Sequence, residues 1–191
     1  MSNEVTNVFV AGVGGQGILL ASEILSDVAL SRGLDVKKSE VHGMAQRGGS
    51  VVSHVRFGEK VYSPVITEGE ADILVSFEKM EGLRWLHYVR GGGTVIVNSQ
   101  EIIPSGLEAY PEGIDGELGK RFPDARLIDA FSLAKDAGHV RAVNTVMLGA
   151  FSSYLDFTED EWRAVIEKRV PPKTIEINTK AFALGREAGA A

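Results

Sequence analysis

A glycine-rich hexapeptide near the N-terminus has the spacing of a phosphate-binding turn. It reads GVGGQG at residues 12–17, matches G-x-G-x-x-G, and lies between an expected strand at 7–11 and an expected helix at 18–31. Glycines allow the tight turn, and the start of the following helix directs free N–H groups at an anion. A turn that only packs the strand against the helix would use the same glycines. The candidate ligand-binding residues of this turn are Gly12, Gly14, Gly15, Gln16 and Gly17.

A dinucleotide such as NAD is one ligand that this turn could bind. That interpretation requires an acidic residue at the end of the second strand, about 20 residues further on. Glu40 stands near that position, at the end of an expected strand over 34–40 that also carries Lys37 and Lys38. The match is partial, and a free-standing NAD(P)-dependent dehydrogenase therefore stays open as one interpretation.

The segment from Ser39 to Ser50 is the second concentration of polar groups and glycines, and it shows no core periodicity. Its arginine can bind a phosphate or a carboxylate through two parallel hydrogen bonds, and the Gly-Gly pair allows close backbone approach. At the carboxyl edge of a parallel sheet, this loop would lie beside the glycine turn. An ordinary connecting loop is the alternative. The candidate binding residues here are Glu40, His42, Met44, Gln46, Arg47, Gly48 and Gly49, with Glu40 and His42 expected to orient Arg47.

Composition excludes several kinds of chemistry. The 191 residues include no cysteine, so the chain cannot supply a disulfide, a thiolate metal ligand or a cysteine nucleophile. Neither His42 nor His54 has a second ligand at helical or turn spacing, and we predict no metal site. A net charge of −6 argues against a nucleic-acid partner. Between residues 32 and 60 there are six basic residues and three acidic ones, which indicates either a chance cluster of solvated charges or a local site for an anion or a partner.

The pattern of apolar runs predicts one α/β domain over residues 1–191. We expect a single Rossmann-like fold, with a mainly parallel sheet, one β-hairpin and helices on both faces. The hairpin is expected between 51–57 and 61–62, and 100–123 is expected to be irregular. No apolar run reaches the roughly 18 residues of a membrane span and no secretory signal is visible, so we expect a cytoplasmic protein without membrane contact. Further strands are expected at 72–77, 94–98 and 126–130, and helices at 79–89, 142–154, 159–169 and 174–186.

Taken together, the motifs resemble one family. GVGGQGILLASEIL, SEVHGMAQRGGSVVSHVRFG, ADILVSFEKMEGLR, GGTVIVN, AVNTVMLGA and NTKAFALG are similar to the gamma-type subunit of 2-oxoacid:ferredoxin oxidoreductases. Within that family, the form HGMAQRGGSVVSHVRFG is typical of the beta subunit of indolepyruvate:ferredoxin oxidoreductases. The resemblance covers nearly the whole chain.

The resemblance implies a heteromeric enzyme that oxidatively decarboxylates 2-oxoacids to acyl-coenzyme A and reduces ferredoxin. It implies thiamine diphosphate, Mg and [4Fe-4S] clusters in the complex. The chain has no cysteine and no G-D-G segment, its nearest string being IDGE at 114–117. We therefore expect these cofactors on a larger alpha-type partner subunit, with no cofactor held by this chain alone.

Three roles stay open for the two loops. They can bind the phosphates of coenzyme A, contact the catalytic partner, or serve only assembly. The resemblance identifies no catalytic residue, and we name none. An aryl-2-oxoacid is the substrate class that the resemblance implies, and pyruvate and branched 2-oxoacids stay open as alternatives.

Overall fold

The computed structural model describes residues 5–43, 49–104 and 106–190, apart from the side chain of His42. Its described part forms a six-stranded sheet in the order β2-β3-β1-β4-β5-β6. Each strand except β3 points the same way, so the expected mainly parallel α/β fold is confirmed. The strands are β1 (Thr6–Val13), β2 (Asp35–His42), β3 (Ser50–Gly58), β4 (Ala71–Ser76), β5 (Val89–Asn98) and β6 (Arg126–Ile128).

The hairpin lies elsewhere than the sequence pattern indicates. β3 pairs antiparallel with β2 on one side and with β1 on the other, while residues 61–62 are not in a strand. Val61 is buried instead, and its N–H donates to the Asp35 carboxylate at 2.9 Å. The prediction of a 51–57 and 61–62 hairpin was wrong because the longer ladder with β2 takes the edge of β3.

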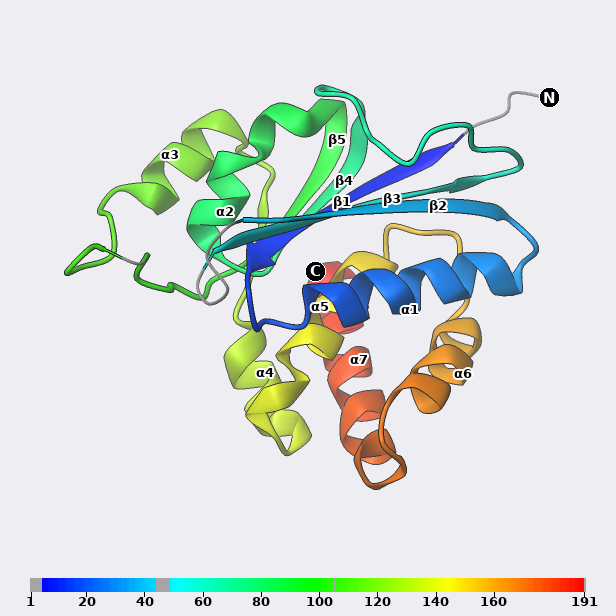
Figure 1. Cartoon of the computed structure of the whole chain (residues 1–191). Coiled ribbons are helices and arrows are strands. Elements are labelled where there is room, and N and C mark those ends of the chain that lie inside the picture. The colour runs from blue at the N-terminus through cyan, green and yellow to red at the C-terminus, as the bar shows by residue number, and fades with distance from the viewer. Residues whose placement is uncertain (1–4, 44–48, 105, 191) are drawn as a thin grey trace.

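Helices cover both faces of the sheet, as expected (Figure 1). The thicker layer packs on the face that includes Val8, Val10 and Val75, whereas the alternate residues Phe9 and Leu74 face the other side. This alternation follows from the two-residue period of a strand. The thicker layer comprises α1 (Ile18–Ser31), α4 (Ala130–Ala137), α5 (Val143–Ser152), α6 (Glu159–Arg169) and α7 (Ile175–Ala190), with the short 3₁₀ turns η2 (Val140–Ala142) and η3 (Pro172–Thr174).

The other face is covered by less regular chain. α2 (Lys79–Arg84), η1 (Leu86–Tyr88) and α3 (Ile114–Arg121) lie over it in Figure 1. Ile66, from the segment between β3 and β4, fills the same core together with Leu118 of α3. α3 lies inside the stretch that we expected to be irregular, and α4 was also missed.

Close helix contact holds the thicker layer together. α5 and α7 meet through glycines: a Cβ placed on Gly185 would lie 1.9 Å from the Val146 carbonyl oxygen, and one on Gly149 would lie 2.1 Å from the Phe182 carbonyl oxygen. Side chains cannot occupy such space. The backbones of α5 and α7 therefore pack directly on each other.

Candidate functional site

The glycine turn connects β1 to α1 at the carboxyl edge of the parallel strands. Gly15 and Gly17 both have positive φ values, 101° and 81°, which favour glycine. Gly17 caps α1 without a side chain, and the first helical bond is donated by Ala21 N–H to the Gly17 carbonyl oxygen at 3.1 Å. The N–H groups of the turn before Ala21 therefore have no acceptor within the helix, which favours an anion there.

The two loops singled out in the sequence are neighbours. Gly14 N–H donates to the Gly49 carbonyl oxygen at 3.0 Å, and Gly43 N–H donates to the Ser50 carbonyl oxygen at 2.9 Å. Both ends of the 43–49 connection therefore sit at the same edge as the glycine turn. Met44, Gln46, Arg47 and Gly48 lie outside the described residues, so their predicted roles stay predictions.

Gln16 holds the turn to the rest of the sheet edge. Its Oε1 accepts a hydrogen bond from Val13 N–H at 2.7 Å. Its Nε2 donates to the Phe77 carbonyl oxygen at 2.7 Å and to Gln100 Oε1 at 3.0 Å. Both amide hydrogens are thus used within the chain, and they join the ends of β1, β4 and β5.

Gly12 has a packing role. A Cβ there would lie 2.8 Å from both Gln16 Oε1 and Ile18 Cδ1, and 2.9 Å from Phe77 Cβ. Gly17 is also crowded, since its Cβ would lie 2.9 Å from Asn144 Nδ2, whereas a Cβ on Gly15 would meet nothing within 4 Å. Open space above the turn is therefore found at Gly15, which is exposed.

The position of Glu40 differs from that of the acid in a dinucleotide site. In such sites the second strand lies next to the first. Here β3 separates β2 from β1, and Glu40 forms an ion pair with Lys38 at 2.7 Å. Two strand spacings, about 10 Å in all, separate Glu40 from β1. Among the described residues, this edge therefore has no acid next to β1 in the position that NAD recognition requires, and His42 pairs with Val51 through its backbone in β2.

Two buried carboxylates at this edge were not singled out in the sequence. Glu81 is 3% exposed and accepts hydrogen bonds from Ser50 Oγ, from Trp85 Nε1 at 3.1 Å and from Arg84 Nε at 3.0 Å. Because Ser50 directly follows Gly49, Glu81 anchors the loop base to α2. The sequence SFEKMEGLR at 76–84 could have indicated these residues, because Glu78 directly follows an apolar strand and Glu81 stands three residues later, the spacing of a helix N-cap and the residue that it caps.

The second carboxylate belongs to Glu78, which is fully buried. It accepts from the Glu81 N–H at 2.9 Å, capping α2, and from the Tyr110 hydroxyl at 2.6 Å. Burial and this carboxylate raise the pKa of Tyr110 well above its usual value. Tyr110 therefore stays protonated and ties the 106–113 segment to α2.

The basic residues between 32 and 60 are largely matched by acids of the same chain. Arg32 pairs with Glu161 at 2.6 Å, and Lys37 pairs with Asp35. Lys38 pairs with Glu40 at 2.7 Å, whereas Arg56 donates to the neutral amide oxygen of Asn7 at 2.8 Å. The local positive charge is thus neutralised by nearby partners at most of its described positions.

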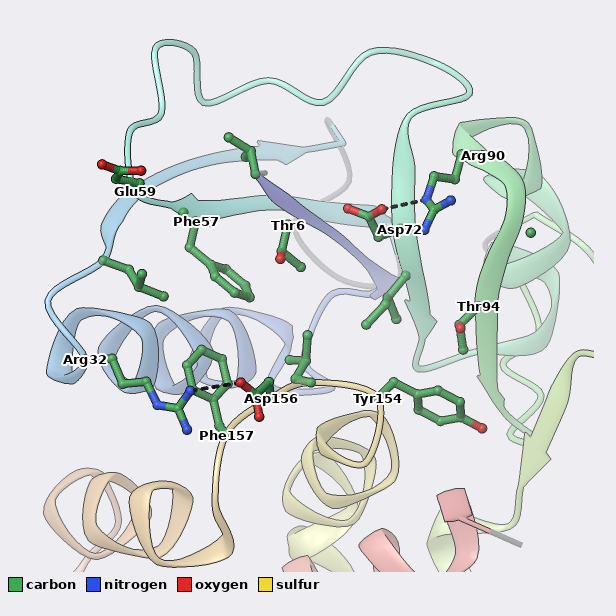
Figure 2. A pocket seen from close by; sticks show the side chains of 16 residues that line it. Thr6, Arg32, Phe57, Glu59, Asp72, Arg90, Thr94, Tyr154, Asp156 and Phe157 are labelled. Atoms are coloured by element: carbon green, nitrogen blue, oxygen red, sulfur yellow. Dashed lines mark hydrogen bonds and ion pairs between the residues drawn. The ribbon is translucent and has the colours of Figure 1, made fainter. Parts of the chain in front are cut away.

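A cavity of about 580 Å³ opens at the opposite, amino edge of the sheet. Figure 2 shows Arg90 paired with Asp72 and Arg32 paired with Asp156 in this cavity, at N–O distances of 2.6 Å and 3.5 Å respectively. No described loop glycine of the two motifs lines it. Among the described residues, no cluster of three or more His, Cys, Asp or Glu could hold a metal ion, and no helix is long and apolar enough to cross a membrane.

Comparison with known proteins identifies the class of enzyme subunit to which this chain belongs. Residues 7–188 match the family described as pyruvate ferredoxin/flavodoxin oxidoreductase, and the chain belongs to that family. It is 42% identical over 194 residues to indolepyruvate oxidoreductase subunit IorB of Thermococcus kodakarensis, with 95% of each chain covered. It is 40% identical to the IorB subunit of Archaeoglobus fulgidus, covering 94% of this chain and 92% of the relative.

Solved structures show the same fold. The gamma subunit of a keto/oxoacid ferredoxin oxidoreductase from Geobacter sulfurreducens aligns with a TM-score of 0.74 at 24% identity, covering 97% of this chain and 99% of that one. A chain of the 2-oxoglutarate:ferredoxin oxidoreductase of Magnetococcus marinus aligns with a TM-score of 0.76 at 21% identity, covering 98% of this chain and 31% of that one. The chain is a subunit of a 2-oxoacid:ferredoxin oxidoreductase, as the sequence resemblance implied.

Proposed function

We propose that this chain is the beta-type subunit of an indolepyruvate:ferredoxin oxidoreductase. In the complex, an aryl-2-oxoacid, coenzyme A and two oxidised ferredoxins yield acyl-coenzyme A, CO₂, a proton and two reduced ferredoxins. The observation that carries the proposal is the 42% identity to IorB over 95% of both chains. An identity of that level over the full length supports the same partner and substrate class.

The redox and decarboxylation chemistry is assigned to the larger alpha-type partner. Thiamine diphosphate with Mg supplies the carbanion chemistry, and [4Fe-4S] clusters carry electrons to ferredoxin. This chain has no cysteine with which to ligate a cluster. The chain itself contributes by completing the complex and by providing a ligand-binding site at the carboxyl edge of its sheet.

For that edge we propose coenzyme A phosphates as the ligand. The support is the uncapped start of α1 at Gly17, the open space at Gly15, and the 43–49 loop held alongside by the Gly14–Gly49 hydrogen bond. The 2-oxoglutarate:ferredoxin oxidoreductase of Magnetococcus marinus, which shares the fold, has coenzyme A bound in its structure. Arg47 is the proposed phosphate partner from the second loop.

Co-expression with the alpha-type partner tests the function. The purified complex should reduce ferredoxin with indolepyruvate only when coenzyme A is present, and this chain alone should show no activity. Activity with NAD and no partner would contradict the proposal. Hydrogen exchange distinguishes coenzyme A binding from a role in assembly alone. If the edge binds coenzyme A, the ligand should slow amide exchange in residues 14–20. If the edge serves only assembly, the partner subunit should slow exchange there and coenzyme A should not.

An Arg47→Ala variant tests the arginine itself. The proposal predicts a raised KM for coenzyme A with assembly intact. An unchanged KM together with intact assembly would remove Arg47 from both roles.

A further inference from the structure

A second cavity lies in the helical layer, where α1, α5 and α7 begin. Its volume is about 540 Å³, and its walls come from the first turns of these helices together with η2, η3 and the end of α6. Leu20, Val170 and Ile177 give it an apolar lining. A cavity of this size accommodates a small organic ligand. We name it the helix-start cleft.

All the charged or titratable side chains that line the described part of the cleft are basic. They are His139, Arg141, Arg169 and Lys173, and no carboxylate is among the lining residues. The whole chain carries a net charge of −6, so this is a local reversal of sign. A concave surface lined with one sign of charge concentrates ions of the opposite sign.

Several donors in the cleft are not used by the chain. Within the described residues, the side chains of Arg141 and Lys173 have no hydrogen bond or ion pair. Arg169 differs, because it is held by Asp27 at 2.5 Å and Glu23 at 3.3 Å. Arg141 and Lys173 are therefore the two cations available for a ligand.

Two further side chains add directional donors. Asn144 Oδ1 accepts from the Thr145 N–H at 2.9 Å, while its Nδ2 has no acceptor in the described chain. His139 Nδ1 accepts from the Arg141 N–H at 3.0 Å, so the neutral ring carries its proton on Nε2. Asn144 also lies against Gly17, which makes the cleft adjacent to the glycine turn.

We propose that the helix-start cleft binds a phosphate-bearing ligand with an apolar or aromatic body, of the nucleotide class. Arg141 and Lys173 bind the phosphate groups, Asn144 and His139 donate hydrogen bonds, and Leu20, Val170 and Ile177 pack against the body. The starts of α5 and α7 strengthen the field for an anion. This goes beyond the proposed function, since the cleft is distinct from the turn at Gly14 and Gly15.

Calorimetric titration of the full chain with ADP, with inorganic pyrophosphate and with coenzyme A tests the proposal. ADP should bind, and more tightly than pyrophosphate, because pyrophosphate lacks the body that the apolar wall contacts. The double variant Arg141→Ala, Lys173→Ala should weaken ADP at least about tenfold. Both residues are exposed, so an unchanged urea midpoint should show that the variant folds.

The matched control is Lys120→Ala, Arg126→Ala, which removes the same charge from exposed positions outside the cleft. It should bind ADP within about twofold of the wild type. Equal weakening in both double variants, or no binding of ADP at millimolar concentration, would overturn the proposal.

Competition identifies the source of the phosphate. If coenzyme A displaces ADP, the ligand of the cleft is the phosphate-bearing end of coenzyme A. If both bind together, the ligand is a separate nucleotide. Ferredoxin reduction by the complex tests the proposed function independently, because loss of ADP binding by Arg141→Ala, Lys173→Ala says nothing about assembly with the partner.

Discussion

The hydrogen bond from Gly14 N–H to the Gly49 carbonyl oxygen, 3.0 Å long, joins two loops that are 35 positions apart in the chain. It exists because β3 runs antiparallel to β1 and pairs Ser50 with Val13. The start of β3 is therefore delivered to the edge where β1 ends. Any ligand or partner that touches the glycine turn also meets the end of the second loop.

Glu81 should be a principal support of this edge. Glu81→Ala leaves the half-buried Ser50 hydroxyl and Trp85 N–H without their acceptor, and should lower the free energy of unfolding by about 1–3 kcal/mol. Urea denaturation measures the change. Glu117→Ala, which removes a surface carboxylate paired with Arg121, is the control and should stay within about 0.5 kcal/mol. Equal losses in the two variants would argue against the anchoring role.

The glycines of the turn should differ in their sensitivity to alanine. Gly12→Ala forces a methyl group to within 2.8–2.9 Å of three atoms and should cost about 2–3 kcal/mol. Gly15→Ala meets no atom within 4 Å but must adopt a φ near 101°, which costs about 1–2 kcal/mol. Urea midpoints of the two variants give the order, and a larger loss for Gly15→Ala would contradict the packing role of Gly12.

The α5–α7 contact should tolerate no side chain at Gly185. A Cβ there would lie 1.9 Å from a backbone oxygen, which cannot move without separating the helices. We expect Gly185→Ala to lower the free energy of unfolding by more than about 3 kcal/mol. Gly116→Ala in α3 has open space and should stabilise the chain by up to about 1 kcal/mol. Thermal unfolding compares them, and similar melting temperatures would be inconsistent with the contact described.

Acid should weaken the link between α1 and α6. The Arg32 guanidinium, with help from the Thr158 N–H, lowers the pKa of Glu161 to about 2 from an ordinary value of 4.5. A lowered folded-state pKa means that the contribution is complete above pH 4.5 and is lost as the pH falls toward 2. Urea midpoints between pH 2 and 6 should therefore drop more steeply for the wild type than for Glu161→Gln. Parallel curves would exclude this ion pair as a source of the pH dependence.

Local signals explain which elements could be predicted from sequence. α6 begins and ends where Thr158, Glu161 and Pro171 indicate, and the capping box is formed on both sides. α4 has a comparable signal, since Asp129 caps it by accepting from the Ser132 N–H at 3.0 Å, but the strand expected over 126–130 obscured it. β2 and β3 are consecutive strands that pair across the 43–49 connection, but the sequence of that connection has no two-residue turn pattern to mark a hairpin.

In the candidate site, too, the parts marked by local motifs could be predicted and the parts made by tertiary packing could not. The glycine turn and its nearness to the second loop follow from motifs and from general properties of parallel sheets. The carboxylates of Glu78 and Glu81 could not be placed, because their burial depends on α2 folding back over β4 and β5. The helix-start cleft also escaped prediction, since His139, Arg141 and Lys173 are scattered in sequence and meet only through tertiary packing.

The register of β3 is strictly constrained, because this strand has a neighbour on each side in the sheet. The strand is hydrogen-bonded on both sides, so one inserted residue would shift two ladders at once and turn every following side chain to the opposite face. His54, buried and accepting the Ile66 N–H at 3.2 Å, would then change places with neighbours that face the helical layer. Length changes should therefore be accepted in the connection around 43–49 but not within the strand, and natural variation in chain length across the family should be concentrated at that hairpin tip.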